Sequence, residues 1–245
     1  MNSDTKAMYS YEYFVNLLFS SSDNLCEPVY YVPSWMGMTS ALFAIAALLL
    51  LVRAIYLSFR VMTTQEFSST LTTFKIIICI GSGGHTTEMI ELVKHLNATK
   101  YRPRLYVIAD DDYTSEARVC EFENGSKDYA IAKIPRSRNV KQSYFSSIFS
   151  TIRSFLSAIP LIFKFKPDAI LCNGPGTCIP VCLTAFLFRC LFMLKCRIVF
   201  VESVCRVRTL SLTGSILQFV ADIFVVQWPQ LKANCLRAQY YGRLT

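Results

Sequence analysis

The segment GSGGHTTE at residues 81–88 follows an apolar run and combines glycines, hydroxyl groups and a histidine. Glycine permits positive φ angles and lets a ligand approach the backbone, and a helix that starts after such a turn offers unpaired N–H groups to an anion. The alternative is a tight strand-to-helix turn with Thr86 or Thr87 as the helix cap. As an anion site the segment would suit a diphosphate, held by Gly81, Ser82, Gly83, Gly84 and Thr86.

His85 lies within this segment and is one of only two histidines in the chain. An imidazole exchanges a proton near neutral pH, so a histidine beside an anion site can act as a catalytic base or contact a substrate. A structural hydrogen bond is the alternative. Both interpretations remain open from the sequence.

A second glycine turn, CNGPGT at residues 172–177, follows a later apolar run. The two turns would face each other at one edge of a parallel sheet, which suits a ligand with two phosphates. The basic segment PRSRNVKQS at residues 135–143 adds positive charge at the same edge, with solvated surface charge as the alternative. The contacts predicted from these two segments are Asn173, Gly174, Gly176, Arg136 and Arg138.

These segments need a scaffold that brings them together. Apolar, strand-like runs alternate with longer helical patterns, which is typical of a parallel sheet with crossover helices. We therefore expect a Rossmann-like α/β domain with its ligands at the carboxyl ends of the strands. The predicted strands are 75–80, 105–109, 129–134, 169–172, 197–201 and 223–226, and the predicted helices are 86–96, 115–123, 144–163, 179–194, 212–219 and 229–237.

The predicted helix at 144–163 carries a broad apolar stripe. We expect this stripe to pack against the sheet, although part of it could instead lie on a bilayer. Residues 182–194 are also apolar around most of a helix circumference, which predicts either a buried or a lipid-facing helix. The stripe consists of Phe145, Ile148, Phe149, Ile152, Phe155, Leu156 and Ile159.

The composition indicates that part of the surface is covered by lipid or by a partner. Of the 245 residues, 53% are hydrophobic and only 17% are charged, which is unusual for a freely soluble domain. No charged residue occurs between Pro28 and Val52, and this stretch is about long enough to cross a bilayer. We expect one uncleaved transmembrane anchor at 35–57, with a cleaved signal peptide as the alternative.

The charges flanking this span predict its orientation. Arg53 and Arg60 follow the span, whereas Asp23 and Glu27 precede it, so the positive-inside rule places the later domain in the cytosol. The sequons at Asn97 and Asn124 should then carry no glycan. The predicted organisation is a lumenal tail at 1–34, the anchor at 35–57, a linker at 58–74 and a cytosolic domain at 75–245.

Net charge and cysteine usage narrow the possible partners. The chain carries a net charge of +8, and because residues 1–52 contain one basic and four acidic residues, the positive charge lies in the rest of the chain. This favours phosphates or an anionic lipid surface. The ten cysteines are scattered and mostly lie in apolar runs, so we expect small core residues in a reducing compartment rather than a metal site or a disulfide framework.

Eight motifs in order resemble one family, the membrane-anchoring subunit of the eukaryotic UDP-N-acetylglucosamine transferase that adds the second GlcNAc to dolichyl-diphosphate-GlcNAc. The resemblance covers about residues 74–245, and the glycine turns also resemble the N-terminal half of the bacterial GT-B enzyme MurG. The motifs are GSGGHTTE at 81–88, VIAD at 107–110, IPRSRNVKQS at 134–143, NGPG at 173–176, VESVCRV at 201–207, LSLTG at 210–214, VQWP at 226–229 and YG at 241–242.

This resemblance implies a division of labour. The chain would anchor the complex in the endoplasmic reticulum membrane and bind dolichyl-diphosphate-GlcNAc, and His85 would be a candidate base for the acceptor hydroxyl. A small cytosolic partner would bind the UDP-GlcNAc donor, so we expect no cofactor, metal or nucleic acid on this chain, and neighbouring enzymes of the pathway are further candidate partners. The partner would dock on Tyr240, Tyr241 and Leu244, with a tail that packs back on its own domain as the alternative.

Two other functions remain open from the sequence. The chain could be a non-catalytic scaffold that recruits the transferase half without contributing a chemical group. It could also be a dinucleotide-dependent oxidoreductase that uses Gly81, Gly83 and Asp110. The oxidoreductase is the weaker alternative, because Thr86 stands where the dinucleotide fingerprint requires glycine or alanine.

Overall fold

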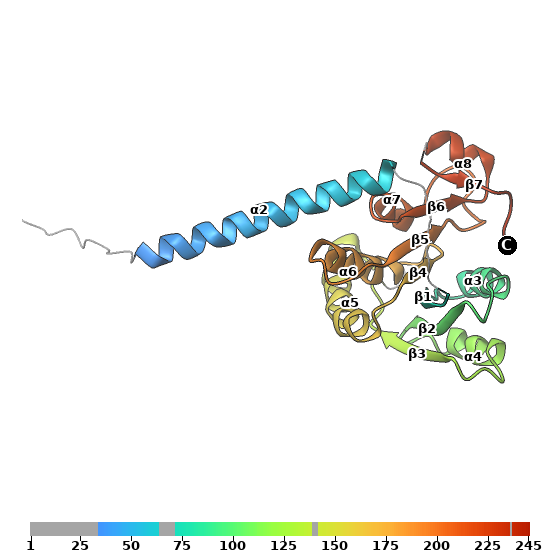
Figure 1. The fold of residues 1–245 in the computed structure, drawn as a ribbon. Helices are drawn as coiled ribbons and strands as arrows, with labels where there is room; N and C mark the ends of the chain where they lie inside the picture. Colours follow the sequence, from blue (N-terminus) through green and yellow to red (C-terminus); the bar gives the residue numbers. More distant parts are fainter. Residues whose placement is uncertain (1–33, 64–71, 139–141, 236) are drawn as a thin grey trace, which may run out of the picture. The chain divides into compact units, whose positions relative to one another are not determined.

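The computed structural model describes residues 34–63, 72–138, 142–235 and 237–245 (Figure 1). The predicted lumenal tail lies, but for its last residue, outside the described residues. Contacts within the chain define two units, Met1–Ala47 and Leu48–Thr245. The first described helix, α2, runs Ser34–Thr63 and contributes its second half to the later unit.

The later unit contains a seven-stranded sheet in the order β3-β2-β1-β4-β5-β6-β7, in which every neighbouring pair is parallel. The order changes direction between β1 and β4, and such a switch point is where an open α/β sheet binds its ligands. The Rossmann-like prediction is therefore confirmed. The strands are β1 Phe74–Cys79, β2 Tyr101–Ala109, β3 Tyr129–Ile134, β4 Ala169–Cys172, β5 Arg197–Val201, β6 Ile223–Val226 and β7 Gln239–Tyr240.

The connecting helices are α3 Gly84–Lys94, α4 Tyr113–Phe122, α5 Tyr144–Phe165, α6 Cys178–Cys190, α7 Leu212–Leu217 and α8 Pro229–Asn234. Figure 1 shows α3 and α4 on one face of the sheet and α5 and α6 on the other. Alternate residues of β1 point to these two faces. Ile77 and Cys79 belong to the hydrophobic core that includes α5 and α6, whereas Ile76 and Ile78 belong to the core that includes α3 and α4. The strand period of two thus builds two cores.

The structure corrects the bounds of several predicted elements and adds one strand. α6 ends at Cys190 rather than Leu194, because Phe192 has a left-handed φ of 59° that no helix continues through. α2 extends to Thr63, so the first part of the predicted linker is helical. The two-residue strand β7, which forms one edge of the sheet, was missed because so short a run has no measurable period.

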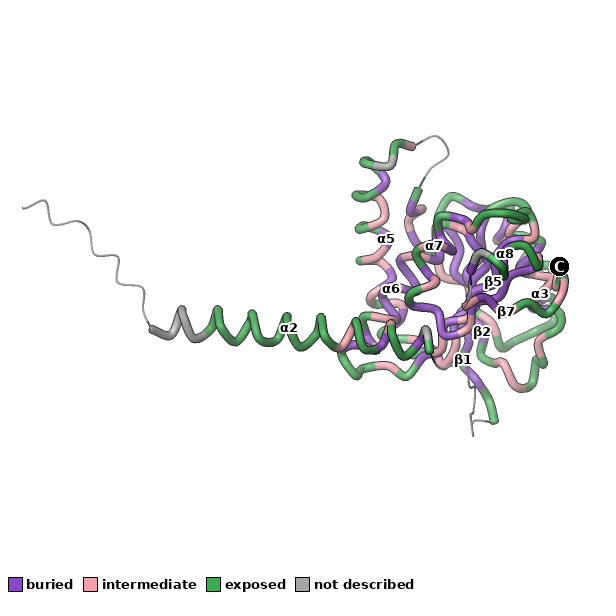
Figure 2. Tube along the Cα trace, turned by 90° about the horizontal axis from the view of Figure 1, so that it is seen from above, coloured by how far each residue is buried: buried purple, intermediate pink, exposed green. Residues whose placement is uncertain are grey.

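The prediction that the stripe on α5 packs against the sheet is wrong for most of its residues. Phe145 is 77% exposed and Phe149 69% exposed, and Ile148, Ile152 and Leu156 are also at least half exposed. Figure 2 shows exposed positions along the first half of α5. The buried apolar residues of this helix, Ala158 and Ile162, lie in its second half, where α5 packs on α6 and the sheet.

Among the described helices, two are long and apolar enough to cross a membrane by length and composition. They comprise Thr39–Val61 in α2 and Phe145–Phe165 in α5. The first agrees with the predicted anchor. The apolar helix α6 is buried instead, with Val181, Cys182 and Ala185 fully inside the core.

Candidate functional site

The two glycine turns meet at the switch point, as the sequence predicts, because β1 and β4 are adjacent and end at the same edge. A side chain at Gly81 would place its Cβ 2.4 Å from Cβ of Pro175. Only glycine allows this approach between the two backbones. The first turn is therefore held directly against the second.

Two glycines of these turns adopt conformations that other residues rarely accept. Gly83 has φ 65° and caps α3, and Gly174 has φ 78°. Gly83, and not Thr86 or Thr87, is thus the cap residue. Thr86 is fully buried, and its hydroxyl donates to the carbonyl of Gly81 and lies 2.7 Å from Oγ of Ser115. The side chain of Thr86 therefore shapes the turn from inside.

His85 and Asn173 join the two turns. Nδ1 of His85 lies 2.9 Å from Oδ1 of Asn173, and a carbonyl oxygen can only accept a hydrogen bond, so Nδ1 carries the proton. This tautomer leaves Nε2 as the basic nitrogen of a neutral imidazole. Asn173 is completely buried, which fixes the ring from behind. The pair has the geometry of a base held by a positioning residue.

A cavity of about 420 Å³ lies beside His85. Its wall is polar, with backbone from glycines, two serine hydroxyls, an acid and a cation. Such a lining suits a sugar better than a hydrophobic ligand. The lining residues are Gly84, His85, Glu88, Gly174, Ser203, Cys205, Arg206 and Ser211.

Glu88 is a site residue that the sequence reasoning missed. The fold brings it against the segment that follows β5, where its Oε1 accepts from Oγ of Ser203 at 2.8 Å. Oε2 of Glu88 and Nδ2 of Asn173 are buried and have no hydrogen-bond partner among the described residues. Buried polar atoms without partners are costly, so they point to a polar ligand at this site.

Glu202 anchors the wall of the cavity from inside the protein. It is fully buried, and its carboxylate accepts from the backbone N–H groups of Ser203 and Ser211 and from the hydroxyl of Ser211. Its own carbonyl accepts from the side chain of Gln227. Glu202 therefore does not face the cavity as a charged group. The structure places only Arg206 on the exposed rim.

Arg136 approaches the first turn but is already paired. It donates to both carboxylate oxygens of Asp111 at 2.9 Å and to Oγ of Ser82 at 3.0 Å. The Asp111 carboxylate raises the pKa of the Arg136 guanidinium. Arg138 donates to the carbonyl of Gln142 instead. Arg136 and Arg138 line a small cavity of about 50 Å³ together with Gly81 and Gly176. The two arginines are therefore still candidates for contact with a phosphate.

Asp112, the last residue of the acidic group after β2, caps α4 through a hydrogen bond from the N–H group of Ser115. Burial works against ionisation, but hydrogen bonds from Ser82 and Ser115 lower the pKa of the Asp112 carboxyl below its ordinary value. Asp111, paired to Arg136, and Asp112, which caps α4, therefore both have structural partners.

The residues predicted to contact a partner lie at the edge of the sheet near the end of the chain. Tyr240 in β7 is 38% exposed and Tyr241 is 66% exposed. Leu244, in contrast, is partly buried against the core on the α3 face. The backbone N–H groups of Leu244 and Thr245 donate to Oε1 of the buried Gln227. The tail therefore packs on its own domain and presents the two tyrosines outward.

Three cysteines lie under the glycine turns. The sulfur atoms of Cys79, Cys172 and Cys178 lie within 4.8 Å of one another and are buried. Burial raises the pKa of the Cys172 thiol well above its ordinary value, as expected for a neutral thiol in an apolar core. The prediction of core cysteines is confirmed for these residues and for Cys182, Cys190 and Cys196.

Comparisons with known proteins agree with these features. The family model described as "Oligosaccharide biosynthesis protein Alg14 like" matches residues 76–244. The human protein named UDP-N-acetylglucosamine transferase subunit ALG14 is 47% identical over 178 residues, which cover 69% of this chain and 82% of that protein. Its Candida albicans counterpart is 38% identical over 215 residues, which cover 84% of this chain and 98% of that protein.

Among solved structures, the crystal structure of MurG from Acinetobacter baumannii is similar with a TM-score of 0.48 and 18% identity. This similarity covers 64% of the chain and 42% of MurG.

Proposed function

Because the chain belongs to the Alg14-like family of oligosaccharide biosynthesis proteins, we propose that it is the acceptor-binding subunit of a UDP-N-acetylglucosamine transferase complex. The acceptor is dolichyl-diphosphate-GlcNAc, and the reaction adds a second GlcNAc. A small soluble subunit binds the UDP-GlcNAc donor. The name of the relatives, which calls them subunits, supports a partner of this kind.

The observation that carries this proposal is the His85–Asn173 pair beside a polar cavity at the switch point. The two glycine turns hold the acceptor diphosphate with backbone N–H groups, as helix starts and glycine turns do elsewhere. The attached sugar occupies the cavity of about 420 Å³. One of its hydroxyls donates to Oε2 of Glu88, a residue that lines this cavity and whose Oε2 has no partner among the described residues.

The chemistry follows from the tautomer of His85. Nε2 takes the proton of the acceptor 4-hydroxyl as this oxygen attacks the anomeric carbon of UDP-GlcNAc. A new carbon–oxygen bond forms, the bond to UDP breaks, and the anomeric configuration inverts. Asn173 keeps the imidazole oriented and stabilises the imidazolium through the hydrogen bond that it accepts from Nδ1.

The chain attaches the complex to the endoplasmic reticulum membrane through α2. The uncharged part of α2, Ser34–Val52, is about long enough to span the hydrocarbon core of a bilayer, and Arg53 and Arg60, which follow it, favour a cytosolic location of the sheet domain. The exposed apolar stripe of α5 supports additional contact with lipid, since Lys164 and Lys166 near its end suit phosphate headgroups.

The complex-dependence of the activity is tested with purified chains. We expect the chain alone to transfer no GlcNAc from radiolabelled UDP-GlcNAc to a short-chain dolichyl-diphosphate-GlcNAc, because it does not bind the donor. Addition of the small cytosolic subunit captured from microsomal extracts should restore transfer. Turnover by the isolated chain at the rate of the complex would contradict the proposal.

The membrane orientation is tested with the two sequons. Asn97 and Asn124 are both exposed, so a lumenal oligosaccharyltransferase could reach them. We expect neither to be glycosylated, because the positive-inside rule places them in the cytosol. An endoglycosidase mobility shift that disappears in Asn97→Gln or Asn124→Gln would reverse the orientation.

The partner surface is tested with point substitutions, since deletion of the tail would also remove β7 and the groups bound to Gln227. We expect Tyr241→Ala to reduce capture of the soluble subunit about tenfold, because exposed aromatic residues dominate interface energies. Tyr113→Ala is the matched control, since Tyr113 is 71% exposed on the distant helix α4. Equal capture by the two variants would place the interface elsewhere.

A further inference from the structure

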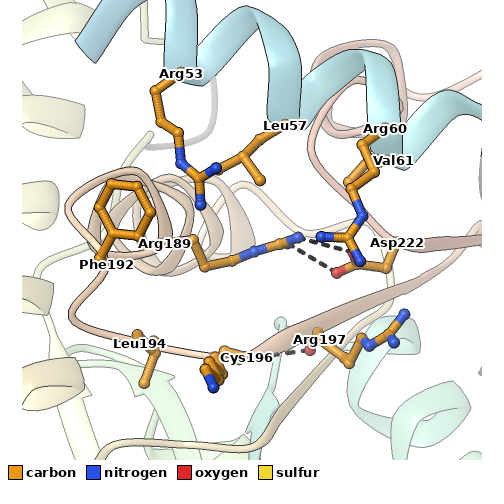
Figure 3. Close-up of a pocket in the computed structure, with 11 residues that line it drawn as sticks. Arg53, Leu57, Arg60, Val61, Arg189, Phe192, Leu194, Cys196, Arg197 and Asp222 are labelled. Carbon is orange, nitrogen blue, oxygen red and sulfur yellow. Dashed lines mark hydrogen bonds and ion pairs between the residues drawn. The ribbon is translucent and has the colours of Figure 1, made fainter. Parts of the chain in front are cut away.

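A second cavity, of about 440 Å³, lies at the amino ends of the strands, whereas the glycine turns lie at the carboxyl ends (Figure 3). Arg197, which begins β5, and Asp222, which directly precedes β6, place it at the amino ends of the strands. The second half of α2 forms its other wall. The cavity therefore shares no residue with the candidate acceptor site. Its lining comprises Arg53, Leu57, Arg60, Val61, Arg189, Phe192, Leu194, Lys195, Cys196, Arg197 and Asp222.

The cavity is strongly positive. Its lining includes five cationic side chains and a single carboxylate, Asp222. This carboxylate is engaged by Arg189, whose two terminal nitrogens donate to its two oxygens at 2.9 and 3.0 Å, and it also accepts from the N–H group of Ile198 at 2.8 Å. Asp222 thus balances one arginine, and the remaining cations leave a net positive charge.

The ring of Phe192 positions the side chain of Arg53, but the Nε–H group of Arg53 has no hydrogen-bond acceptor among the described residues. Its guanidinium stacks on the ring of Phe192, with the central carbon 4.0 Å from the ring centroid. Its Nε is buried and has no hydrogen-bond partner among the residues that the structure describes. Figure 3 shows Arg53 reaching from α2 into the space above Arg189 and Phe192. An N–H group buried in this way is costly unless an anion accepts from it.

The position of Arg53 along α2 identifies the source of the anion. The part of α2 from Ser34 to Val52 is about 28 Å long at 1.5 Å per residue, which nearly equals the roughly 30 Å of a bilayer's hydrocarbon core. Arg53 follows directly and therefore lies at the depth of the phosphate headgroups. Leu57, Val61 and Leu194 add apolar surface to the same cavity, as the start of an acyl chain would require.

We propose that this cavity binds the headgroup phosphate of an anionic glycerophospholipid, with Arg53, Arg60 and Lys195 as its contacts. The inference rests on the membrane attachment of α2 proposed above and not on the transfer reaction. The bound lipid would fix the second half of α2 against the sheet domain, since the cavity is lined by both. Lipid binding thus uses the amino ends of the strands, and sugar transfer uses their carboxyl ends.

The test measures binding to the purified full chain in a neutral detergent by native mass spectrometry. The probes are dioctanoyl phosphatidic acid, dioctanoyl phosphatidylcholine and glycerol 3-phosphate. We expect phosphatidic acid to bind at least tenfold more tightly than either of the others. Arg53→Gln should weaken this binding about tenfold, as expected for the loss of a charge-assisted hydrogen bond, and Arg243→Gln, an exposed arginine near the end of the chain, should not change it.

A second variant, Lys195→Gln, tests the site even if Arg53→Gln fails to fold, because Lys195 is exposed and its substitution should not affect folding. Its charge-matched control is Lys127→Gln, since Lys127 is also exposed. If these two lysine variants weaken the binding of phosphatidic acid equally, the attraction is non-specific and the proposed site is wrong.

If phosphatidylcholine binds as tightly as phosphatidic acid, the proposed preference for an anionic lipid is wrong. If glycerol 3-phosphate binds as tightly as phosphatidic acid, the proposal that the ligand is a lipid is wrong. Release of the chain from microsomes by alkaline carbonate would overturn the membrane attachment and this inference together, whereas a failed transfer assay would leave it intact.

Discussion

The His85→Ala variant, assembled with the soluble subunit, is expected to lose about 10²- to 10⁴-fold in turnover, the usual contribution of a general base. The hydrogen bond from Nδ1 to Asn173 holds Nε2 as the basic nitrogen beside the cavity. The loss should appear in kcat, because the base acts on the transition state and the diphosphate contacts remain. Radiolabelled GlcNAc transfer at saturating acceptor measures it.

His95→Ala is the matched control, since it removes the other histidine of the chain. His95 is exposed at the end of α3 and lies 3.7 Å from Glu91 on the surface, so its loss should leave turnover unchanged. Capture of the soluble subunit by both variants should equal that of the wild type. If His85→Ala retains full turnover in an intact complex, the chain is a scaffold and contributes no base.

A second large effect is expected for stability: Glu202→Ala should lower the free energy of unfolding by on the order of 3 to 5 kcal/mol. The substitution leaves the N–H group and hydroxyl of Ser211 and the N–H group of Ser203 without their buried acceptor. It also empties a tightly packed space, since a Cβ at Gly214 would lie 2.4 Å from Oε2 of Glu202. Denaturant unfolding of the detergent-purified chain measures the change.

Glu121→Ala provides the comparison, because Glu121 is exposed on α4 and its removal should change stability by less than about 0.5 kcal/mol. Comparable stability of the Glu121 and Glu202 variants would mean that water replaces the lost carboxylate. The carbonyl of Glu202 also accepts from Gln227, whose Oε1 holds the backbone of Leu244 and Thr245. Because this carbonyl belongs to the backbone, Glu202→Ala retains the contact with Gln227, so we expect the folded variant to capture the soluble subunit as the wild type does.

The pattern of the sequence predicted most of the sheet domain. The strands β3, β4, β5 and β6 begin and end where the apolar runs do. For the inner strands β4, β5 and β6 the reason is that strands covered on both faces read as continuous hydrophobic runs. The ends of the helices were predicted less accurately. In α6, for example, the positive φ of Phe192 ends the helix within an apolar run. No local signal distinguishes this turn from continued helix.

The exposed stripe of α5 shows a second limit of the sequence. Amphipathic spacing predicts an apolar face but not what covers it, and the face of Phe145 and Phe149 extends past the contacts that bury Ala158 and Ile162. The hydrophobic period is the same for a helix on a sheet and a helix on lipid. Only the packing of the neighbouring elements separates the two cases.

The sequence by itself determined the alternation of strands and helices, the glycine turns that follow β1 and β4, and the long apolar helix that precedes the sheet domain, because each depends on local propensity or on hydrophobic period. Tertiary structure decided which side chains meet. It brought Asn173 to His85 and Ser203 to Glu88 across more than eighty residues of chain, and it gathered Arg53 and Lys195 around one cavity. Such contacts follow from strand order and from the crossing of helices over the sheet, which the period of a single segment does not encode.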